Sequence, residues 1–86
     1  MFINKTEEGY CNLCGVHVAR LRKEMGLSQR ELADRLQLAG LDVDKNAIQR
    51  IEARKRFVTD IELVAISRVL GEPLEGLLHP ADPEPA

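Results

Sequence analysis

Two capping boxes, set among helical spacings, constrain the fold of this chain more than any other feature. Residues 28–31 (SQRE) and 59–62 (TDIE) both follow the pattern S/T-x-x-E, in which the hydroxyl and the carboxylate satisfy free amides at a helix start. No run of strand length alternates apolar and polar residues, and no hairpin dipeptide joins two such runs. The sequence therefore predicts an all-α fold.

Five helices are expected from these caps and from the spacing of apolar residues. The first covers residues 12–25, ends before Gly26, and would turn one stripe inward, made of Leu13, Val18, Leu21 and Met25. The others are expected at 29–38, at 45–54 behind an N-cap at Asp44, at 60–70 before Gly71, and at 73–78. Five short helices predict a compact all-α domain.

The length allows one small domain. A chain of 86 residues buries only about 60–65% of its unfolded surface, so dimerisation would add to its stability. We expect residues 12–79 to form the domain, residues 1–11 to be a flexible segment, and residues 80–86 to be a disordered acidic tail. No apolar run approaches the ~18 residues of a membrane helix, and no secretory signal opens the chain, so we expect a cytoplasmic protein without a membrane partner.

Charge is unevenly distributed along the chain. The formal net charge is −2, yet residues 45–56 carry five basic side chains against the single acid Glu52, whereas residues 72–86 carry four acids and no Lys or Arg. The basic patch fits a polyanionic partner, although a charge run is often no more than a solvated face. Aromatic residues make up 3% of the chain, which excludes the stacking platforms that bind single-stranded nucleic acid.

Three segments carry a resemblance to a known family. They read LRKEMGLSQRELA, IQRIE and LVAISRVLG, and with their flanks they span about residues 14–78. In these segments the chain resembles the xenobiotic-response-element/Cro family of helix-turn-helix domains, which includes phage repressors. The resemblance implies a lambda-repressor-like fold in which the helix at 45–54 is the recognition helix. The connection between Leu36 and Ile48 is longer than the family's usual tight turn, which bears on the angle of that helix.

The outward face of the expected recognition helix carries groups that can read bases. On a helical wheel Ile48 and Ile51 share one face, and an amide and guanidinium face lies opposite. The major groove admits one helix, and there Asn or Gln pairs with adenine while Arg or Lys pairs with guanine. We therefore expect double-stranded DNA as the partner, with base contacts from Lys45, Asn46, Gln49 and Arg50.

Four further residues are expected to contact the DNA backbone. Gln29, just inside the second helix, looks like the phosphate-contacting Gln of the family. Arg54, Lys55 and Arg56 follow the recognition helix, where a flanking phosphate would pass. For Arg54, complementing the negative end of the helix is an equally good explanation.

The resemblance also implies an ion pair between Arg22 and Glu52, linking the first helix to the recognition helix. Neither residue lies on the outward face, so the pair would be structural. Breaking one partner of a partly buried pair costs about 3–5 kcal/mol, which would abolish DNA binding without removing a DNA contact.

Cys11 and Cys14 form a lone CxxC followed by His17. A zinc site needs four ligands, and the other His is His79, far along the chain. A redox CxxC begins a helix within a βαβ unit, for which no strand pattern is present nearby. We favour a reduced pair with Cys14 partly buried against the first helix, so neither metal nor cofactor is expected; zinc binding and redox use are the alternatives.

The chain lacks the parts of a catalytic site. Ser28 and Ser67 have no His and acid in pattern, and no phosphate loop of the GxxxxGK type occurs. The carboxylates of Glu31 and Glu62 are explained by capping. We therefore do not expect an enzyme.

The predicted function is that of a sequence-specific transcriptional regulator, acting as a repressor and nucleoid-associated when bound. One recognition helix reads only a few base pairs, so a homodimer on paired half-sites is expected. The alternative is an antitoxin-like or regulator-binding module that uses the acidic C-terminal helix with Leu74, Leu77 and Leu78. We favour the interpretation that these leucines close the domain's own core or a symmetric dimer.

Overall fold

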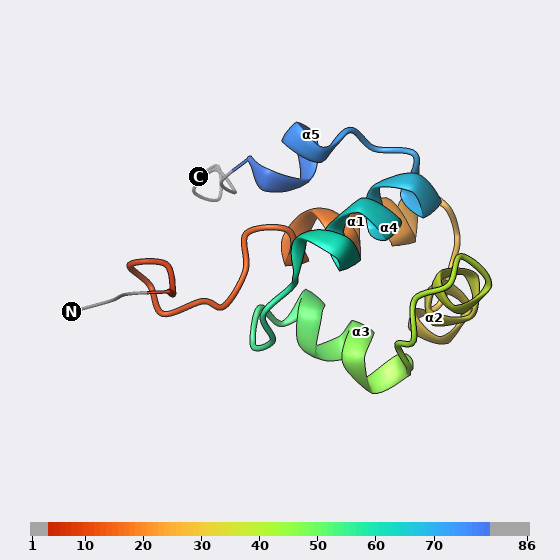
Figure 1. The fold of residues 1–86 in the computed structure, drawn as a ribbon, viewed down its shortest axis with the longest axis horizontal. Coiled ribbons are helices and arrows are strands. Elements are labelled where there is room, and N and C mark those ends of the chain that lie inside the picture. The colour runs from red at the N-terminus through yellow and green to blue at the C-terminus, as the bar shows by residue number, and fades with distance from the viewer. Residues whose placement is uncertain (1–3, 80–86) are drawn as a thin grey trace.

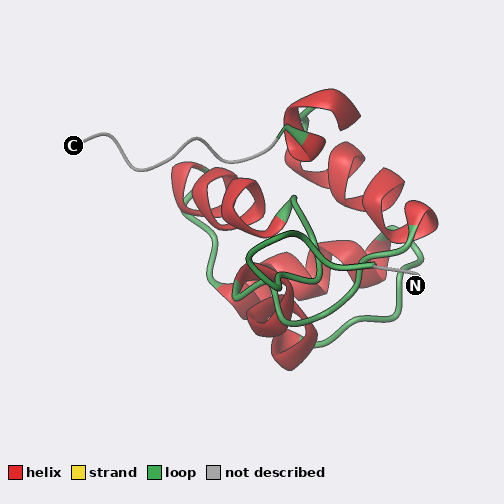
Figure 2. Ribbon diagram, turned by 90° about the vertical axis from the view of Figure 1, so that its left-hand side faces the viewer, coloured by secondary structure: helices red, strands yellow, loops and turns green. Residues whose placement is uncertain are grey.

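The computed structural model describes residues 4–79, where all regular structure is helical (Figure 1, Figure 2). The helices are α1 (Gly15–Glu24), α2 (Gln29–Leu38), α3 (Lys45–Glu52), α4 (Asp60–Leu70) and α5 (Leu74–Leu78). The predicted all-α, five-helix fold is confirmed. The expected tail at 80–86 lies outside the described residues, as do residues 1–3. No helix in the described part is both long and apolar enough to cross a membrane.

Both capping boxes are present. Ser28 Oγ accepts from the amide of Glu31 at 3.0 Å, and the Glu31 carboxylate accepts from the amide of Ser28 at 2.9 Å. Thr59 and Glu62 make the same reciprocal bonds at 3.2 and 2.9 Å. Gly71 ends α4 in the left-handed conformation, with φ of 67°. These boundaries follow from local chemistry, and their prediction is confirmed.

Two predicted helix boundaries are wrong by more than one residue. The first helix begins at Gly15 and not at Asn12, because the Asn12 carboxamide lies outside the helix and accepts from the amide of Gly15 at 2.9 Å. α3 ends at Glu52, two residues early, because Arg54 takes a positive φ of 61° that no α-helix accommodates. Both departures lie where the N-terminal segment meets the end of α3.

The hydrophobic core draws on all the described helices. Its fully buried large side chains are Val18, Leu32, Leu36, Ile48, Ile51, Ile66 and Leu77, together with Cys14. The predicted inward stripe of α1 is wrong at both ends, since Leu13 is 37% and Met25 41% exposed. Leu13 precedes the helix, and Met25 is the C-cap that comes directly after Glu24. Neither residue therefore follows the helical period.

The arrangement of the helices leaves one face of α3 uncovered. In Figure 1, α1 and α4 occupy the middle of the molecule, α5 lies above them, and α3 lies below. α3 packs against α1 and α2, whereas α5 packs against α1 and α4. The side of α3 that points away from α5 therefore faces solvent.

Candidate nucleic-acid interface

The outer face of α3 carries polar side chains without partners among residues 4–79. The four predicted base-contacting residues are all exposed: Lys45, Asn46, Gln49 and Arg50. Within residues 4–79 their side chains make no hydrogen bond or ion pair. The opposite face is buried, with Ile48 at 0% and Ile51 at 1% exposure. Amide, guanidinium and ammonium groups are thus displayed on one side of a helix that is fixed by its other side.

The N-terminal end of α3 is capped and joined to α2 through residues 39–44. Asp44 Oδ1 accepts from the amide of Ala47 at 2.8 Å, as the sequence predicts for an N-cap. Val43 is buried in the core, and its carbonyl accepts from Gln37 Nε2 at 2.7 Å. The long connection between the two helices is therefore fixed to the protein just before α3 begins.

The C-terminal end of α3 closes with a left-handed turn. The amide of Lys55 donates to the carbonyl of Arg50 at 2.9 Å and that of Arg54 to Ile51 at 3.0 Å, the pattern of a Schellman motif. The left-handed position is usually Gly, but here it is Arg54, whose guanidinium lies 3.6 Å from the centroid of the Tyr10 ring. The Lys55 side chain is exposed and has no partner among the described residues.

A buried ion pair joins α1 to α3. Arg22 Nε and Nη2 donate to the Glu52 carboxylate at 2.6 and 3.0 Å, and the two side chains are only 11% and 9% exposed. Arg22 Nη1 also donates to the carbonyl of Leu27 at 2.8 Å. Its hydrogen bond to Glu52 raises the pKa of Arg22, so the guanidinium stays charged throughout the physiological range. Gln29 Nε2 donates to the same carboxylate at 3.0 Å, which brings the start of α2 into the network.

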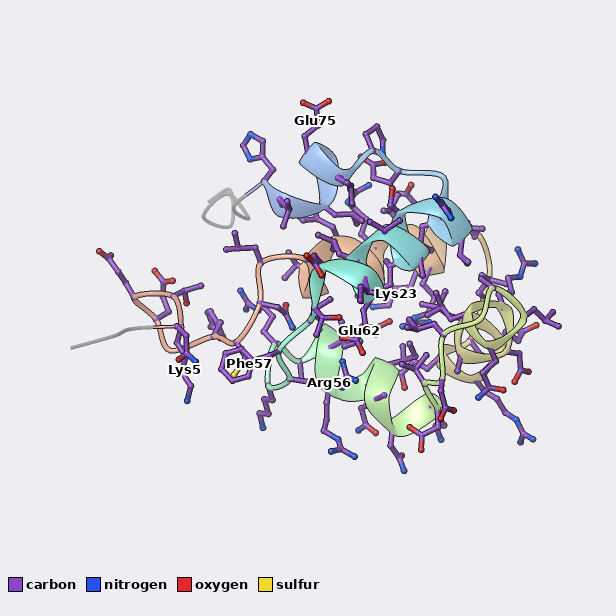
Figure 3. The ribbon with its side chains drawn as sticks, in the orientation of Figure 1. Lys5, Lys23, Arg56, Phe57, Glu62 and Glu75 are labelled. Atoms are coloured by element: carbon purple, nitrogen blue, oxygen red, sulfur yellow. The ribbon has the colours of Figure 1, made fainter. Side chains whose placement is uncertain are left out.

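Arg56, one of the predicted phosphate contacts, is engaged with a carboxylate inside the domain. Its guanidinium binds both oxygens of Glu62 at 3.0 and 2.9 Å and donates to the carbonyl of Phe57 at 3.1 Å. Figure 3 shows Arg56 and Glu62 facing each other between α3 and α4. Hydrogen bonds from Arg56 lower the pKa of Glu62. This pair links the turn after α3 to the start of α4.

Residues ahead of α1 contact the end of α3, and the helical pattern did not reveal them. Tyr10 lies on the segment expected to be flexible, residues 1–11, and Asn12 lies where the first helix was expected to begin. Residues 6–10 form a turn, in which the amide of Thr6 donates to the carbonyl of Tyr10 at 2.9 Å. The residues that Asn12 and Tyr10 contact lie at or just after the end of α3, about 40 residues away in sequence. No local sequence pattern indicates contacts over such a separation.

The cysteine pair lies at this same junction. Cys14 is 1% exposed, and burial raises the pKa of its thiol to about 11, so the thiol is protonated at neutral pH. Cys11 is half-buried and also reduced. Among residues 4–79 no three His, Cys, Asp or Glu side chains come together as metal ligands would. The ring of His17 is instead 2.7 Å from the carbonyl of His79.

Comparison with known proteins agrees with this geometry. A model of the helix-turn-helix family matches residues 18–77, from α1 to α5 and well over half of the chain. No curated protein matches the sequence. The match includes α2, the connection and α3 in order. The chain therefore belongs to the xenobiotic-response-element/Cro family of DNA-binding helix-turn-helix regulators.

Proposed function

We propose that this protein is a sequence-specific transcriptional repressor that reads the major groove with α3. The observation that carries the proposal is that the side chains of Asn46, Gln49 and Arg50, on the outer face of α3, have no partner among the described residues. Unpaired amide and guanidinium groups on a single exposed helix face are what base-edge recognition requires. Lys45, in the first turn, is placed for the same role because early residues of a recognition helix reach the bases first.

The proposed backbone contacts differ in how well the structure supports them. Lys55 is best supported, because its exposed side chain has no partner among the residues described. Arg54 lies on the same turn, with its guanidinium held over Tyr10. Gln29 keeps one amide hydrogen for a phosphate after binding Glu52. Arg56 is least supported, since Glu62 and Phe57 already take three of its donor positions.

We propose that the protein acts in the cytoplasm as a homodimer that binds two DNA half-sites. Leu77 is fully buried and belongs to the core, whereas Leu74 and Leu78 on α5 are 41% and 45% exposed. α5 lies on the side opposite α3 in Figure 1, and Glu75 on it points outward in Figure 3. The same exposed leucines would serve the alternative function, in which α5 binds a partner regulator.

The experiment that tests the proposal is selection of bound duplexes from a random library by the purified protein. An enriched inverted repeat with half-site centres about 10–11 base pairs apart supports both base reading and a dimer. A single short site would support base reading and contradict the dimer. Absence of enrichment at low salt would overturn the proposed function and favour the protein-binding alternative.

The double variant Asn46→Ala/Arg50→Ala then tests the assigned contacts. Each bidentate base contact contributes about 1–3 kcal/mol, so the variant is expected to lose its preference for the selected site over scrambled duplex. The matched control is Asn4→Ala/Arg20→Ala, which makes the same two substitutions at exposed positions outside α3. Full preference in the first variant, with folding intact, would show that the contacts are assigned wrongly.

A further inference from the structure

The segment ahead of α1 is attached to the end of α3. We call residues 10–14 the N-terminal strap; they precede the part of the chain that the family model matches. The amide of Cys11 donates to the carbonyl of Arg54 at 2.9 Å, and the Tyr10 ring lies under the Arg54 guanidinium. The strap thus contacts the left-handed residue that closes α3, through both its main chain and its side chain.

Asn12 provides the strongest attachment. Its Nδ2 donates to the carbonyl of Ile51 at 3.2 Å and to the carbonyl of Arg56 at 2.8 Å, and its Oδ1 accepts from the amide of Gly15 at 2.9 Å. Ile51 lies in the last turn of α3 and Arg56 in the turn that follows it. One carboxamide therefore fixes the start of α1, the end of α3 and the exit from α3 relative to one another.

The approach of the two main chains is close at this point. A Cβ on Gly15 would lie 2.2 Å from the carbonyl oxygen of Ile51, so only glycine fits. The first turn of α1 and the last turn of α3 therefore touch without an intervening side chain, and Asn12 bridges them alongside.

The end of α3 needs such support. The helix has only eight residues, too few for stability on its own, and it is closed by Arg54 in a left-handed conformation that is unfavourable for a non-glycine residue. Without the strap, the carbonyls of Arg54 and Arg56 would lose these partners and the closing turn would fray into solvent.

We propose that the N-terminal strap is a functional part of the DNA-reading site, with Asn12 as the residue that positions α3. The inference rests on the proposed function: the bases are read by α3, and the strap sets the angle at which α3 meets them. Asn12 itself is half-buried, and its carboxamide is engaged in hydrogen bonds within the protein. Its effect is expected on the discrimination between sequences, since phosphate contacts tolerate a tilted helix better than base contacts do.

The variant Asn12→Ala tests this role, with Asn4→Ala as the matched control, because Asn4 is exposed ahead of the strap and makes no side-chain hydrogen bond within the described residues. We expect Asn12→Ala to bind the selected duplex about tenfold more weakly, while its affinity for scrambled duplex, which depends on the basic side chains of the same turn, falls by a much smaller factor. Equal loss on both duplexes, or equal behaviour of the two variants, would overturn the inference.

Asn12→Asp distinguishes the hydrogen bond that this side chain accepts from Gly15 from the two that it donates at the end of α3. The carboxylate still accepts from the amide of Gly15 but has no donor for the carbonyls of Ile51 and Arg56. We expect it to lose discrimination at least as strongly as Asn12→Ala. Wild-type discrimination in Asn12→Asp would show that the bonds to α3 are dispensable, which contradicts the inference.

Hydrogen exchange provides a readout that does not depend on DNA. The amides of Ala53, Arg54 and Lys55 close α3, and in Asn12→Ala we expect them to exchange at least tenfold faster while those of α4 keep their rates. Unchanged exchange at these amides would overturn the role of the strap. If no duplex is enriched by the wild type, the proposed function fails, while faster exchange in Asn12→Ala would still establish the attachment to α3.

Tyr10 offers a second route if Asn12→Ala does not fold. Tyr10→Ala removes the ring beneath Arg54, whereas Tyr10→Phe retains it. We expect Tyr10→Ala to show the same selective loss of discrimination in weaker form, and Tyr10→Phe to restore wild-type behaviour. Equal discrimination by Tyr10→Ala and the wild type would contradict the proposed positioning role.

Discussion

The two ends of α3 are held in different ways. The N-terminal end has one side-chain cap, from Asp44, and a buried Val43 just before it. The C-terminal end is held by a buried ion pair at Glu52, by the carboxamide of Asn12 and by direct contact with Gly15. One end is thus exposed and lightly attached, and the other is fixed on several sides.

The difference shows how a short helix can be both accessible and well positioned. Side chains that read bases must be free of partners in the protein, which limits how much structure can surround them. Lys45 and Asn46 lie at the lightly held end, and the fixed end lies about two turns away. Anchoring one end sets the direction of the helix, so the other end does not need contacts that would cover its side chains.

Removing a contact at the C-terminal end of α3 is expected to have the largest effect on the free energy of unfolding. Arg22→Ala leaves the buried Glu52 carboxylate without its counterion and should lower the free energy of unfolding by about 3–5 kcal/mol. Chemical denaturation provides the measurement. The matched control is Arg20→Ala, which breaks an exposed pair with Glu24 on the same helix and should cost no more than about 0.5 kcal/mol. Similar losses in the two variants would show that the Glu52 network does not anchor α3.

The link from the end of α3 to α4 is expected to be weaker and to depend on pH. Because Arg56 lowers the pKa of Glu62 in the folded protein, the ionised carboxylate stabilises the fold above the pKa of an unfolded glutamate, 4.5, and this contribution is lost as pH falls below that value. Glu62→Gln should therefore lower the free energy of unfolding by about 1.5 kcal/mol at pH 7 and by much less at pH 3.

Urea denaturation at the two pH values tests this dependence. Glu75→Gln, on the exposed side of α5 (Figure 3), is the control and should leave stability within about 0.5 kcal/mol of the wild type at pH 7. A difference between wild type and Glu62→Gln that stays constant from pH 7 to pH 3 would mean that the ion pair with Arg56 contributes nothing.

Substitution at the N-terminal end of α3 should have the smallest effect on the free energy of unfolding. Asp44→Ala removes the N-cap of α3 and is expected to cost about 1 kcal/mol in thermal or chemical unfolding, with Asp44→Asn close to wild type. Asp42→Ala is the control, since Asp42 is exposed on the same connection and has no partner among the described residues. A loss at Asp44 as large as at Arg22 would remove the contrast between the two ends.

Local chemistry explains what could be predicted from the sequence. Both capping boxes, the N-cap at Asp44 and the left-handed Gly71 involve residues within a few positions of one another, and the structure confirms all of them. The fold class follows from these signals together with the family resemblance. The outward position of Lys45, Asn46, Gln49 and Arg50 likewise follows from the period of one helix, although their contact with bases is still a prediction.

Non-local contacts account for what the sequence did not reveal. The sequence around Asn12 is typical of a helix start, but its side chain binds the carbonyls of Ile51 and Arg56, which are 39 and 44 residues away. These bonds keep Asn12 outside the helix. The helical period extends α3 to Arg54 because nothing near this residue marks a positive φ. Arg22 and Glu52, 30 residues apart, are connected in the sequence only through the family resemblance.

The contact at Gly15 makes α3 a lever with its pivot at one end. The free end of the helix lies seven residues from Glu52, about 10 Å along the axis. A rotation of about 6° at the pivot would displace Lys45 by about 1 Å, a shift comparable to the tolerance of a hydrogen bond. Small changes in the packing of the glycine junction are therefore magnified at the N-terminal end of α3. If α3 reads bases as proposed, a substitution at this junction would alter the preference among sequences without changing any residue of the outer face.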